Sequence, residues 1–343
     1  MKHIYCTTAM VFALMAGSAS AQEAKALNLY NWGNYTNPEL LTKFEAETGI
    51  KVTVTDYDSN DTALAKVRAG GSGYDIVVPS ANFVPIWIAE GLLLESRPDQ
   101  LENFVNMDPR WIDVDWDPGR RFTVPWQWGT MGPVVATDYY KGDINTHAIW
   151  LDPPDELKGK INVAPEKNDV LYAAIAYMGG EWCDGDRDML RKVRDKLVEA
   201  KQHWISMDYG IEKMDSRDTL AQLYYNGAAF RARAVNADVA YGYAKEGYHI
   251  FMDSAAVLAD APHPENAKLF MNFIMAPENA ALISNFANYG NGILGSEEFM
   301  LPSMKDAPEL NVPEEFQAFG GWQEVCAPEV DALYTSIWTD LMK

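Results

Sequence analysis

No stretch of this 343-residue sequence reaches the eighteen or so apolar residues that a membrane span requires. The apolar run near the start, AMVFALMAG, is too short for a span and follows a positive charge at Lys2. The residues ASA before Gln22 have the small-x-small form of a signal-peptidase site, so we expect residues 1–21 to be a signal peptide cleaved after Ala21. The mature chain is therefore expected outside the cytoplasm, most simply in a bacterial periplasm.

Cysteine and histidine are scarce. Beyond the signal peptide only Cys183 and Cys326 remain, and an oxidising compartment permits them to form a disulfide. The alternative is two separate buried thiols that act as small apolar residues. The histidines of the mature chain are scattered without the spacing of metal ligands, so we expect neither a metal site nor a cofactor. These histidines are His147, His203, His249 and His263.

Positive charge is also in short supply. The chain has 28 lysines and arginines against 49 aspartates and glutamates, which gives a formal net charge of −21. Such a balance argues against nucleic acid and anionic membranes as partners, and it would attract cations. The alternative interpretation is that the acidic surface only keeps an exported protein soluble.

Catalytic signatures are absent as well. The sequence contains no GxSxG, SxxK or HExxH pattern, and AGGSGYD (69–75) lacks the Lys-Ser/Thr ending of a phosphate-binding loop. Pairs of aspartates are in principle able to cleave glycosides, so an exported hydrolase stays as a less favoured alternative. We expect a protein that is not an enzyme.

The first ninety residues alternate between strand and helix patterns. Asn37 is a good helix cap, Pro38 suits the first turn, and Gly49 suits the end. The resulting βαβαβα order predicts an α/β fold with a mostly parallel sheet flanked by helices. The predicted elements are strands over 26–32, 50–57 and 74–80, and helices beginning near Asn37, Asn60 and Phe83.

Polar and aromatic side chains follow two of these strands. Ligands of parallel sheets bind beyond the carboxyl ends of the strands, and those ends carry NWGNY (31–35) and PSANF (79–83). Roughly 320 mature residues favour two lobes, and the later strand and helix patterns indicate that the lobes interleave along the chain. Among these patterns, FRARAV (230–235) predicts a strand with Arg231, Arg233 and Val235 on one face.

Three segments carry a resemblance to a known family. They are LYNWGNYTNPELLTKFEAETGIKVTVTDYDSNDTALAKVRAGGSGYDIVVPSANFV, LDPPDELKGKI and HPENAKLFMNFIMAPENAALIS. They resemble the periplasmic spermidine/putrescine-binding proteins of ABC importers, a branch of the type II solute-binding proteins. The resemblance implies two α/β lobes joined by crossing strands that close over a polyamine by hinge motion.

The resemblance also implies bounds and partners. We expect the first lobe over 22–130 plus 250–288 and the second over 131–249 plus 289–343. The protein is expected to be a monomer that hands its amine ligand to an ABC permease in the inner membrane. An iron or sugar carrier of the same fold is a further alternative.

Ligand-contacting positions of the family can be matched one by one. Gly33 replaces a hydroxyl residue of the family, which removes one hydrogen bond, and Val235 stands where the family's GWxGD motif has its tryptophan. The matched positions are Trp32, Gly33, Ser80, Glu166, Asp169, Asp238, Phe251, Asp253 and Tyr289.

These residue types suit an alkyl amine. An ammonium group needs carboxylate acceptors, and aromatic faces stabilise cations and cover methylenes. Asp169, Asp238 and Asp253 are the expected acceptors.

The two arginines of FRARAV complicate this interpretation. On a strand, Arg233 would reach the space that the missing indole leaves, either to pair with Asp169 or Glu166 or to bind a carboxylate of the ligand. In the second case the ligand would carry both an amine and a carboxylate, as an amino acid derivative or an acylated polyamine such as γ-glutamylputrescine does. Arg231 is expected deeper in the structure, paired with a structural carboxylate.

Overall fold

The computed structural model describes residues 23–343, so the predicted signal peptide lies outside the described residues. Strands and helices alternate from the start of this range, as predicted. Asn37 accepts a hydrogen bond from the Glu39 amide, and Gly49 ends the first helix in the left-handed conformation with φ of 70°. The first elements are β1 (Ala26–Trp32), α1 (Pro38–Thr48), β2 (Lys51–Tyr57), α2 (Asn60–Arg68), β3 (Ile76–Val77) and α3 (Val84–Ala89).

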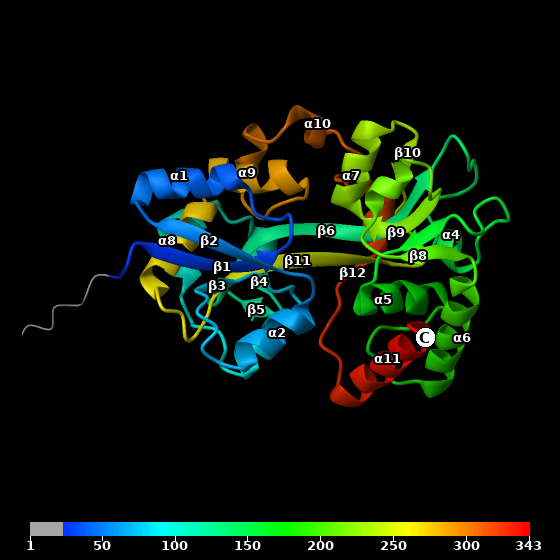
Figure 1. The fold of residues 1–343 in the computed structure, drawn as a ribbon, viewed down its shortest axis with the longest axis horizontal. Coiled ribbons are helices and arrows are strands. Elements are labelled where there is room, and N and C mark those ends of the chain that lie inside the picture. The colour runs from blue at the N-terminus through cyan, green and yellow to red at the C-terminus, as the bar shows by residue number, and fades with distance from the viewer. Residues whose placement is uncertain (1–22) are drawn as a thin grey trace, which may run out of the picture.

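One sheet runs through the whole molecule in the order β2-β1-β3-β11-β6-β9-β7-β8. Strands β1, β2 and β3 pair in parallel in the first lobe, and β7, β8 and β9 pair in parallel in the second. The long strands β6 (Thr123–Ala136) and β11 (Tyr248–Val257) pair antiparallel and cross between the lobes (Figure 1). The shorter strands are β4 (Asp113–Val114), β5 (Asp117–Pro118), β7 (Ile161–Val163), β8 (Trp204–Met207), β9 (Ala221–Tyr225), β10 (Val239–Tyr241) and β12 (Gly320–Gly321).

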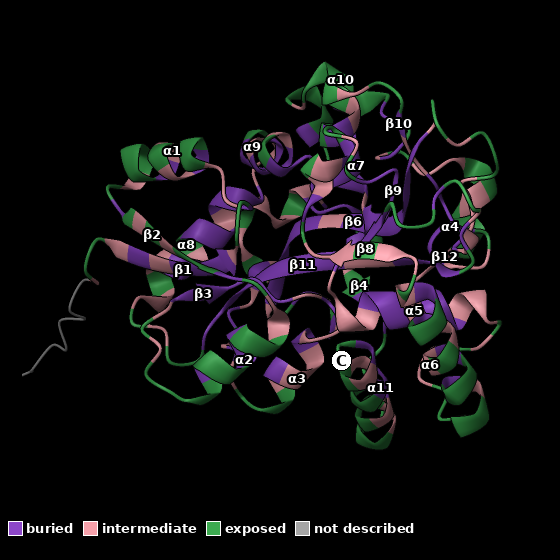
Figure 2. Cartoon of the chain, turned by 45° about the vertical axis from the view of Figure 1, so that its right-hand side comes forward, coloured by how far each residue is buried: buried purple, intermediate pink, exposed green. Residues whose placement is uncertain are grey.

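Helices cover the sheet and present exposed outer faces, while the central strands are buried (Figure 2). Among residues 23–343, no helix combines the length and apolar character needed to cross a membrane. The remaining helices are α4 (Ala148–Leu151), α5 (Lys167–Tyr177), α6 (Arg187–Lys201), α7 (Asn226–Val235), α8 (Pro264–Ile274), α9 (Pro277–Ala287), α10 (Pro302–Lys305) and α11 (Pro328–Leu341).

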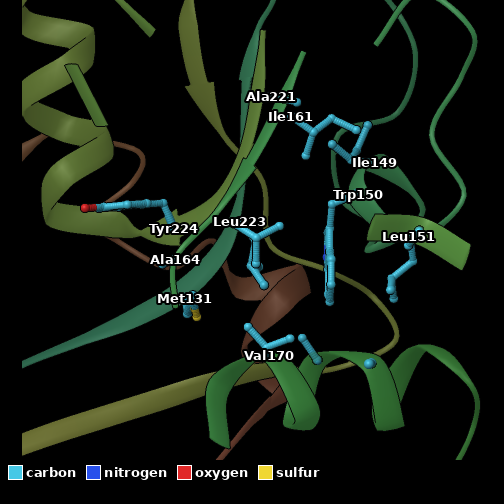
Figure 3. Close-up of a cluster of buried hydrophobic side chains, with 14 of the residues drawn as sticks. Met131, Ile149, Trp150, Leu151, Ile161, Ala164, Val170, Ala221, Leu223 and Tyr224 are labelled. Carbon is cyan, nitrogen blue, oxygen red and sulfur yellow. The ribbon is translucent and has the colours of Figure 1, made fainter. Parts of the chain in front are cut away.

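Each lobe has a hydrophobic core of its own. In the second lobe, Figure 3 shows the indole of Trp150 between Leu223 and Leu151, above Val170 of α5. Tyr224 follows Leu223 on β9, and its hydroxyl points away from this core, because successive strand residues face opposite sides. Two separate cores are what allow the lobes to hold a site between them.

The predicted strand over 230–235 is wrong, because these residues belong to helix α7. The segment is rich in alanine, the strongest helix former, and α7 buries Ala228, Ala229 and Ala232 on one side. Arg231 and Arg233 lie two residues apart, so a helix points them about 200° apart, whereas a strand would place both on one face.

The chain returns to the second lobe after residue 289, where the sequence analysis placed the boundary. Gly290 and Ile293 form bridges with Trp128 and Met107, so residues 290–296 still contact the first lobe. Further on, Met304 of α10 packs against Phe230 of α7 in the second lobe.

Cys183 and Cys326 form a disulfide across 143 residues of sequence, which confirms the first of the two alternatives. Cys183 lies between α5 and α6, and Cys326 lies just before α11. The bond therefore fixes the end of the segment that carries β12 across the molecule. Residues 322 and 323 of this segment reach the site described below.

Candidate ligand-binding site

A cleft of about 520 Å³ lies between the lobes and is lined from both sides. A concave site of this volume, lined by aromatic rings and a few polar groups, is typical of small-molecule binding. Its principal lining residues are Trp32, Gly33, Tyr35 and Ser80 from the first lobe, Glu166, Asp169, Tyr209, Tyr225 and Arg231 from the second, and His249, Phe251, Asp253, Tyr289 and Gln323 from the connecting segments.

Asp253 is the carboxylate on the first-lobe wall of the cleft, and it is only 7% exposed. Its Oδ1 accepts a hydrogen bond from Ser80 Oγ at 2.6 Å, and its Oδ2 accepts one from the Tyr35 hydroxyl at 3.0 Å. Burial raises the pKa of Asp253 to about 6, although both hydroxyls lower it in part. No ion pair within residues 23–343 involves Asp253, so its negative charge has no cation of the protein to match it.

Aromatic rings surround this carboxylate. Tyr289 makes edge contacts with Phe251 and Tyr35, at ring-centroid distances of 5.6 and 6.0 Å. The indole of Trp32 is fixed by a hydrogen bond of 3.0 Å to the Val78 carbonyl. These ring faces and edges suit the methylenes and the positive charge of an alkyl amine.

Gly33 leaves open space beside Trp32. A side chain placed there would meet no atom within 4 Å, so packing does not require a glycine at this position. The absence of a hydroxyl here therefore removes a hydrogen-bonding group and leaves room for a larger ligand.

Asp169 is the corresponding carboxylate on the second-lobe wall, in the first turn of α5. It accepts hydrogen bonds from the Tyr225 hydroxyl at 2.7 Å and from Gln323 Nε2 at 2.8 Å. His249 Nδ1 lies 3.0 Å from Asp169 Oδ1, within ion-pair distance but not aligned as a hydrogen bond. Burial raises the pKa of Asp169, but His249 and the hydrogen bonds outweigh it, so the net shift of this pKa is downward.

Glu166 precedes α5 and accepts a hydrogen bond from the Tyr209 hydroxyl. Burial raises the pKa of Glu166 to about 8, and the negative charge of Asp169 adds to the rise. Glu166 is therefore mostly protonated at neutral pH. The next residue, Lys167, also lines the cleft, and its ammonium group pairs with Asp331 at 3.0 Å.

Two predicted site residues lie elsewhere. Asp238 follows α7, its side chain is 59% exposed, and the ion pair it forms is with Arg217 at 4.0 Å. Arg233 pairs with the buried Glu309 at 2.8 Å and contacts neither Asp169 nor Glu166. The expectation for Arg233 assumed a strand over 230–235, whereas that for Asp238 came from matching the GWxGD motif of the family. Neither residue lines the cleft.

The structure also suggests a different match for the GWxGD pattern. Strand β9 ends in the cleft at Tyr225, and the sequence Tyr224–Ala228 reads YYNGA. A side chain at Gly227 would approach the Asn288 carbonyl to 2.6 Å, so this position requires glycine. In that match Tyr225 replaces the tryptophan of the pattern and Ala228 replaces its aspartate.

Several lining residues were missed by the sequence analysis. His249 was recoverable, because it shares one face of β11 with Phe251 and Asp253 at a spacing of two residues. Tyr225 and Gln323 gave no such signal. They reach the cleft through tertiary packing of segments far apart in the sequence. The expectation that Arg231 pairs with a structural carboxylate deeper in the structure is wrong, because Arg231 lines the cleft and donates to the Ala287 carbonyl.

No group of three or more histidine, cysteine or acidic side chains within the described range has the arrangement of a metal site. The buried carboxylates Asp253 and Asp169 are instead surrounded by hydroxyls, an amide and a histidine. Such an arrangement can accept hydrogen bonds from a cationic ligand.

Comparisons with known proteins agree with this geometry. The family model described as "Bacterial extracellular solute-binding protein" matches residues 39–312. A putrescine-binding periplasmic protein of Pseudomonas aeruginosa is 30% identical over 322 residues, which cover 88% of this chain and 87% of the relative. A putrescine-binding periplasmic protein of Escherichia coli is 28% identical over 354 residues, covering 95% and 94%.

Solved structures share the fold. A putative spermidine/putrescine ABC transporter from Listeria monocytogenes has a TM-score of 0.86 at 26% identity, covering 93% of this chain and 99% of its own. The structure titled Atu4243-GABA receptor has a TM-score of 0.69 at 18% identity, covering 92% and 97%. The first of these confirms the predicted two-lobe α/β fold of the type II solute-binding proteins.

Proposed function

This chain belongs to the family of bacterial extracellular solute-binding proteins, and we propose that it captures a polyamine or related cationic amine between its two lobes. The observation that carries this proposal is Asp253. It is a buried carboxylate that faces the cleft, receives hydrogen bonds from two neutral hydroxyls and forms no ion pair within the described residues 23–343. An ammonium group would supply both the positive charge and further hydrogen-bond donors.

The proposal extends to the protein's place in transport. The relatives named above are periplasmic binding proteins, so we propose that the loaded protein delivers its ligand in the periplasm to an ABC permease of the inner membrane. Closure of the two lobes around the β6 and β11 crossing would bring Asp253 and Asp169 onto one ligand.

We further propose that the protein releases its ligand unchanged. Among the cleft residues, Ser80 is the candidate nucleophile. Its hydroxyl donates a hydrogen bond to Asp253, and no histidine contacts it within residues 23–343. Ser80 therefore lacks the Ser–His pair that commonly activates a serine for attack, and we propose that Asp253 holds the ligand instead of activating Ser80.

Calorimetric titration of putrescine, spermidine and a panel of monoamines into the mature protein tests the proposal. In a separate thermal melt, a bound amine should also raise the melting temperature of the protein, because a ligand that binds only the native state stabilises it. Asp253→Asn removes the proposed acceptor of the ammonium group. Asp238→Asn is its matched control, because it removes an exposed carboxylate outside the cleft. If no amine binds while a neutral sugar does, the proposed function is wrong.

A further inference from the structure

Arg231 is a positive charge in a cleft that otherwise suits cations. Its side chain lines the cleft from helix α7, and its Nη1 donates a hydrogen bond of 2.5 Å to the Ala287 carbonyl. Ala287 is the last residue of α9, and the free carbonyls at a helix C-terminus favour a nearby cation. The end of α9 therefore holds this guanidinium in place without neutralising it.

No carboxylate matches the charge of Arg231. Within residues 23–343, none of the ion pairs includes this residue, whereas Arg233 on the same helix pairs with Glu309. Three carboxyl groups of the cleft accept hydrogen bonds from other groups: Asp253 from Ser80 and Tyr35, Asp169 from Tyr225 and Gln323, and Glu166 from Tyr209. Asp58, Asp61 and Glu212 also line the cleft, and none of them forms an ion pair with Arg231 within residues 23–343. Of the two arginines on α7, the one that faces the ligand space is thus the one left without a counter-charge.

The position of Arg231 relative to Asp253 follows from Tyr289. Burial raises the pKa of Tyr289, Arg231 partly offsets this rise, and Asp253 adds to it, so both charged groups act on this phenol. Tyr289 in turn contacts Phe251, whose strand β11 also carries Asp253. Arg231 and Asp253 therefore line the same cleft, and both lie close enough to Tyr289 to act on it.

A guanidinium in this place has a definite chemical preference. Its planar donors match a carboxylate with two hydrogen bonds, and its charge repels an ammonium. On the second-lobe wall, Glu166 adds little negative charge to offset this preference, because it is mostly protonated at neutral pH.

We propose that Arg231 binds a carboxylate at the far end of the ligand whose ammonium is held by Asp253. The ligand class is then an amine that also carries a carboxylate, such as an amino acid derivative or an acylated polyamine. This inference rests on the proposed function, since it takes the ammonium site at Asp253 as given, and it moves to Arg231 the role that the sequence analysis considered for Arg233.

Three ligands that share an ammonium on a four-carbon chain test the inference. Butylamine has no second charged group, putrescine has a second ammonium, and 5-aminopentanoate has a carboxylate after the same four carbons. Each is titrated by calorimetry into wild type, Arg231→Gln, Arg231→Lys and the control Arg191→Gln. Arg191 is an exposed residue of α6 that pairs with Asp188, away from the cleft.

Wild type should bind 5-aminopentanoate at least tenfold more tightly than putrescine. Arg231→Gln should weaken 5-aminopentanoate at least tenfold and leave butylamine within threefold, while Arg231→Lys should keep part of the preference because it keeps the charge. Arg191→Gln should change nothing. Circular dichroism and melting of each variant confirm that it is folded.

The outcomes separate the two proposals. If wild type prefers putrescine and Arg231→Gln leaves the ratio of the two affinities unchanged, Arg231 does not select the ligand, while the proposed function stands. If none of the three ligands binds, the proposed ammonium site itself is wrong, and the inference falls with it.

Discussion

The two walls of the cleft hold carboxylates in opposite settings. On the first-lobe wall, Asp253 receives two neutral hydroxyl donors, and burial raises its pKa to about 6. On the second-lobe wall, Asp169 lies beside His249, and its pKa is shifted downward despite burial. A buried charge without a partner is costly to the protein, and a bound cation relieves that cost.

This difference indicates that the first-lobe wall binds the ligand and that the second-lobe wall stabilises the fold. Asp253 accepts hydrogen bonds from neutral hydroxyls alone and can receive its counter-charge from the ligand, whereas Asp169 lies beside His249 and accepts hydrogen bonds from Tyr225 and Gln323. We therefore expect substitutions on the first-lobe wall to change affinity and substitutions on the second-lobe wall to change stability. The predictions below test this division.

Removing the disulfide should have the largest effect, and it should fall on stability. Cys326 lies three residues after Gln323, so the bond fixes the segment that supports the second-lobe wall. Closing a loop of 143 residues contributes about 2–5 kcal/mol to the free energy of unfolding. The double variant Cys183→Ser/Cys326→Ser, unfolded in urea beside wild type, measures the loss. An unchanged midpoint would show that the bond does not stabilise this lobe.

Asp253→Asn should weaken amine binding by about 10- to 100-fold, because a charge-assisted hydrogen bond of about 1.5–3 kcal/mol is lost. The ligand-free variant should lose less stability than Asp169→Asn at pH 7.5. One hydroxyl of Ser80 or Tyr35 loses its acceptor, but the substitution also removes a buried charge that is unfavourable above its raised pKa. Calorimetry and thermal melting measure the two quantities. A fall in stability with unchanged affinity would reverse the assignment of the two walls.

Asp169→Asn should show the opposite behaviour. An asparagine can replace one accepting oxygen but not both, so a buried donor of Tyr225 or Gln323 loses its acceptor, at a cost of about 1–3 kcal/mol in unfolding free energy. Amine affinity should fall less than fivefold, because the two oxygens of Asp169 already accept hydrogen bonds from Gln323 and Tyr225, and His249 lies against one of them. A loss of affinity as large as that of Asp253→Asn would make the walls equivalent.

The pH dependence of binding should follow Asp253. An ammonium binds the ionised carboxylate, so affinity should fall about tenfold as the pH decreases from 7 to 5 through the pKa of about 6. The same group makes the ligand-free protein less stable as the pH rises from its ordinary pKa of 3.8 to about 6, because the folded state holds the proton more tightly. Butylamine titrations across this range, with Asp253→Asn as control, should show the dependence only in wild type.

Glu166→Gln should have the smallest effect at pH 7, less than threefold on amine affinity. With its pKa raised to about 8, Glu166 is already mostly neutral, and glutamine preserves its shape. At pH 9 the wild-type carboxylate is ionised and should attract the ammonium more strongly than the variant does. Equal affinities at pH 9 would mean that Glu166 does not face the ligand's charge.

Local signals in the sequence were sufficient for part of the fold. The cap at Asn37 and the left-handed turn at Gly49 bound α1, and the βαβαβα order follows from such signals together with hydrophobic periodicity. The short run over 230–235 was ambiguous, because alternation of alanine and arginine fits a strand face while the alanines favour a helix. Tertiary packing of the alanines decided between them.

The site was predictable where a residue lies at a strand end or on a strand face. Trp32, Ser80 and Asp253 are placed in the cleft by β1, by the end of the β3 segment and by β11. Asp238 was predicted wrongly because the family motif was matched to residues 234–238, whereas the structure favours residues 224–228. The carboxylate of Asp238 lies on the surface. Arg231 and Gln323 reach the cleft from a helix and a crossing segment whose positions no local pattern specifies.

We propose above all that Asp253 holds the ammonium group of the ligand. A crystal structure of the protein in complex with a bound amine tests it most directly, through the positions of the ligand nitrogens. We expect an ammonium nitrogen of the ligand about 2.8 Å from a carboxylate oxygen of Asp253, between the rings of Trp32 and Phe251. A ligand whose nitrogens all contact Asp169 or Glu166, with none near Asp253, would contradict it.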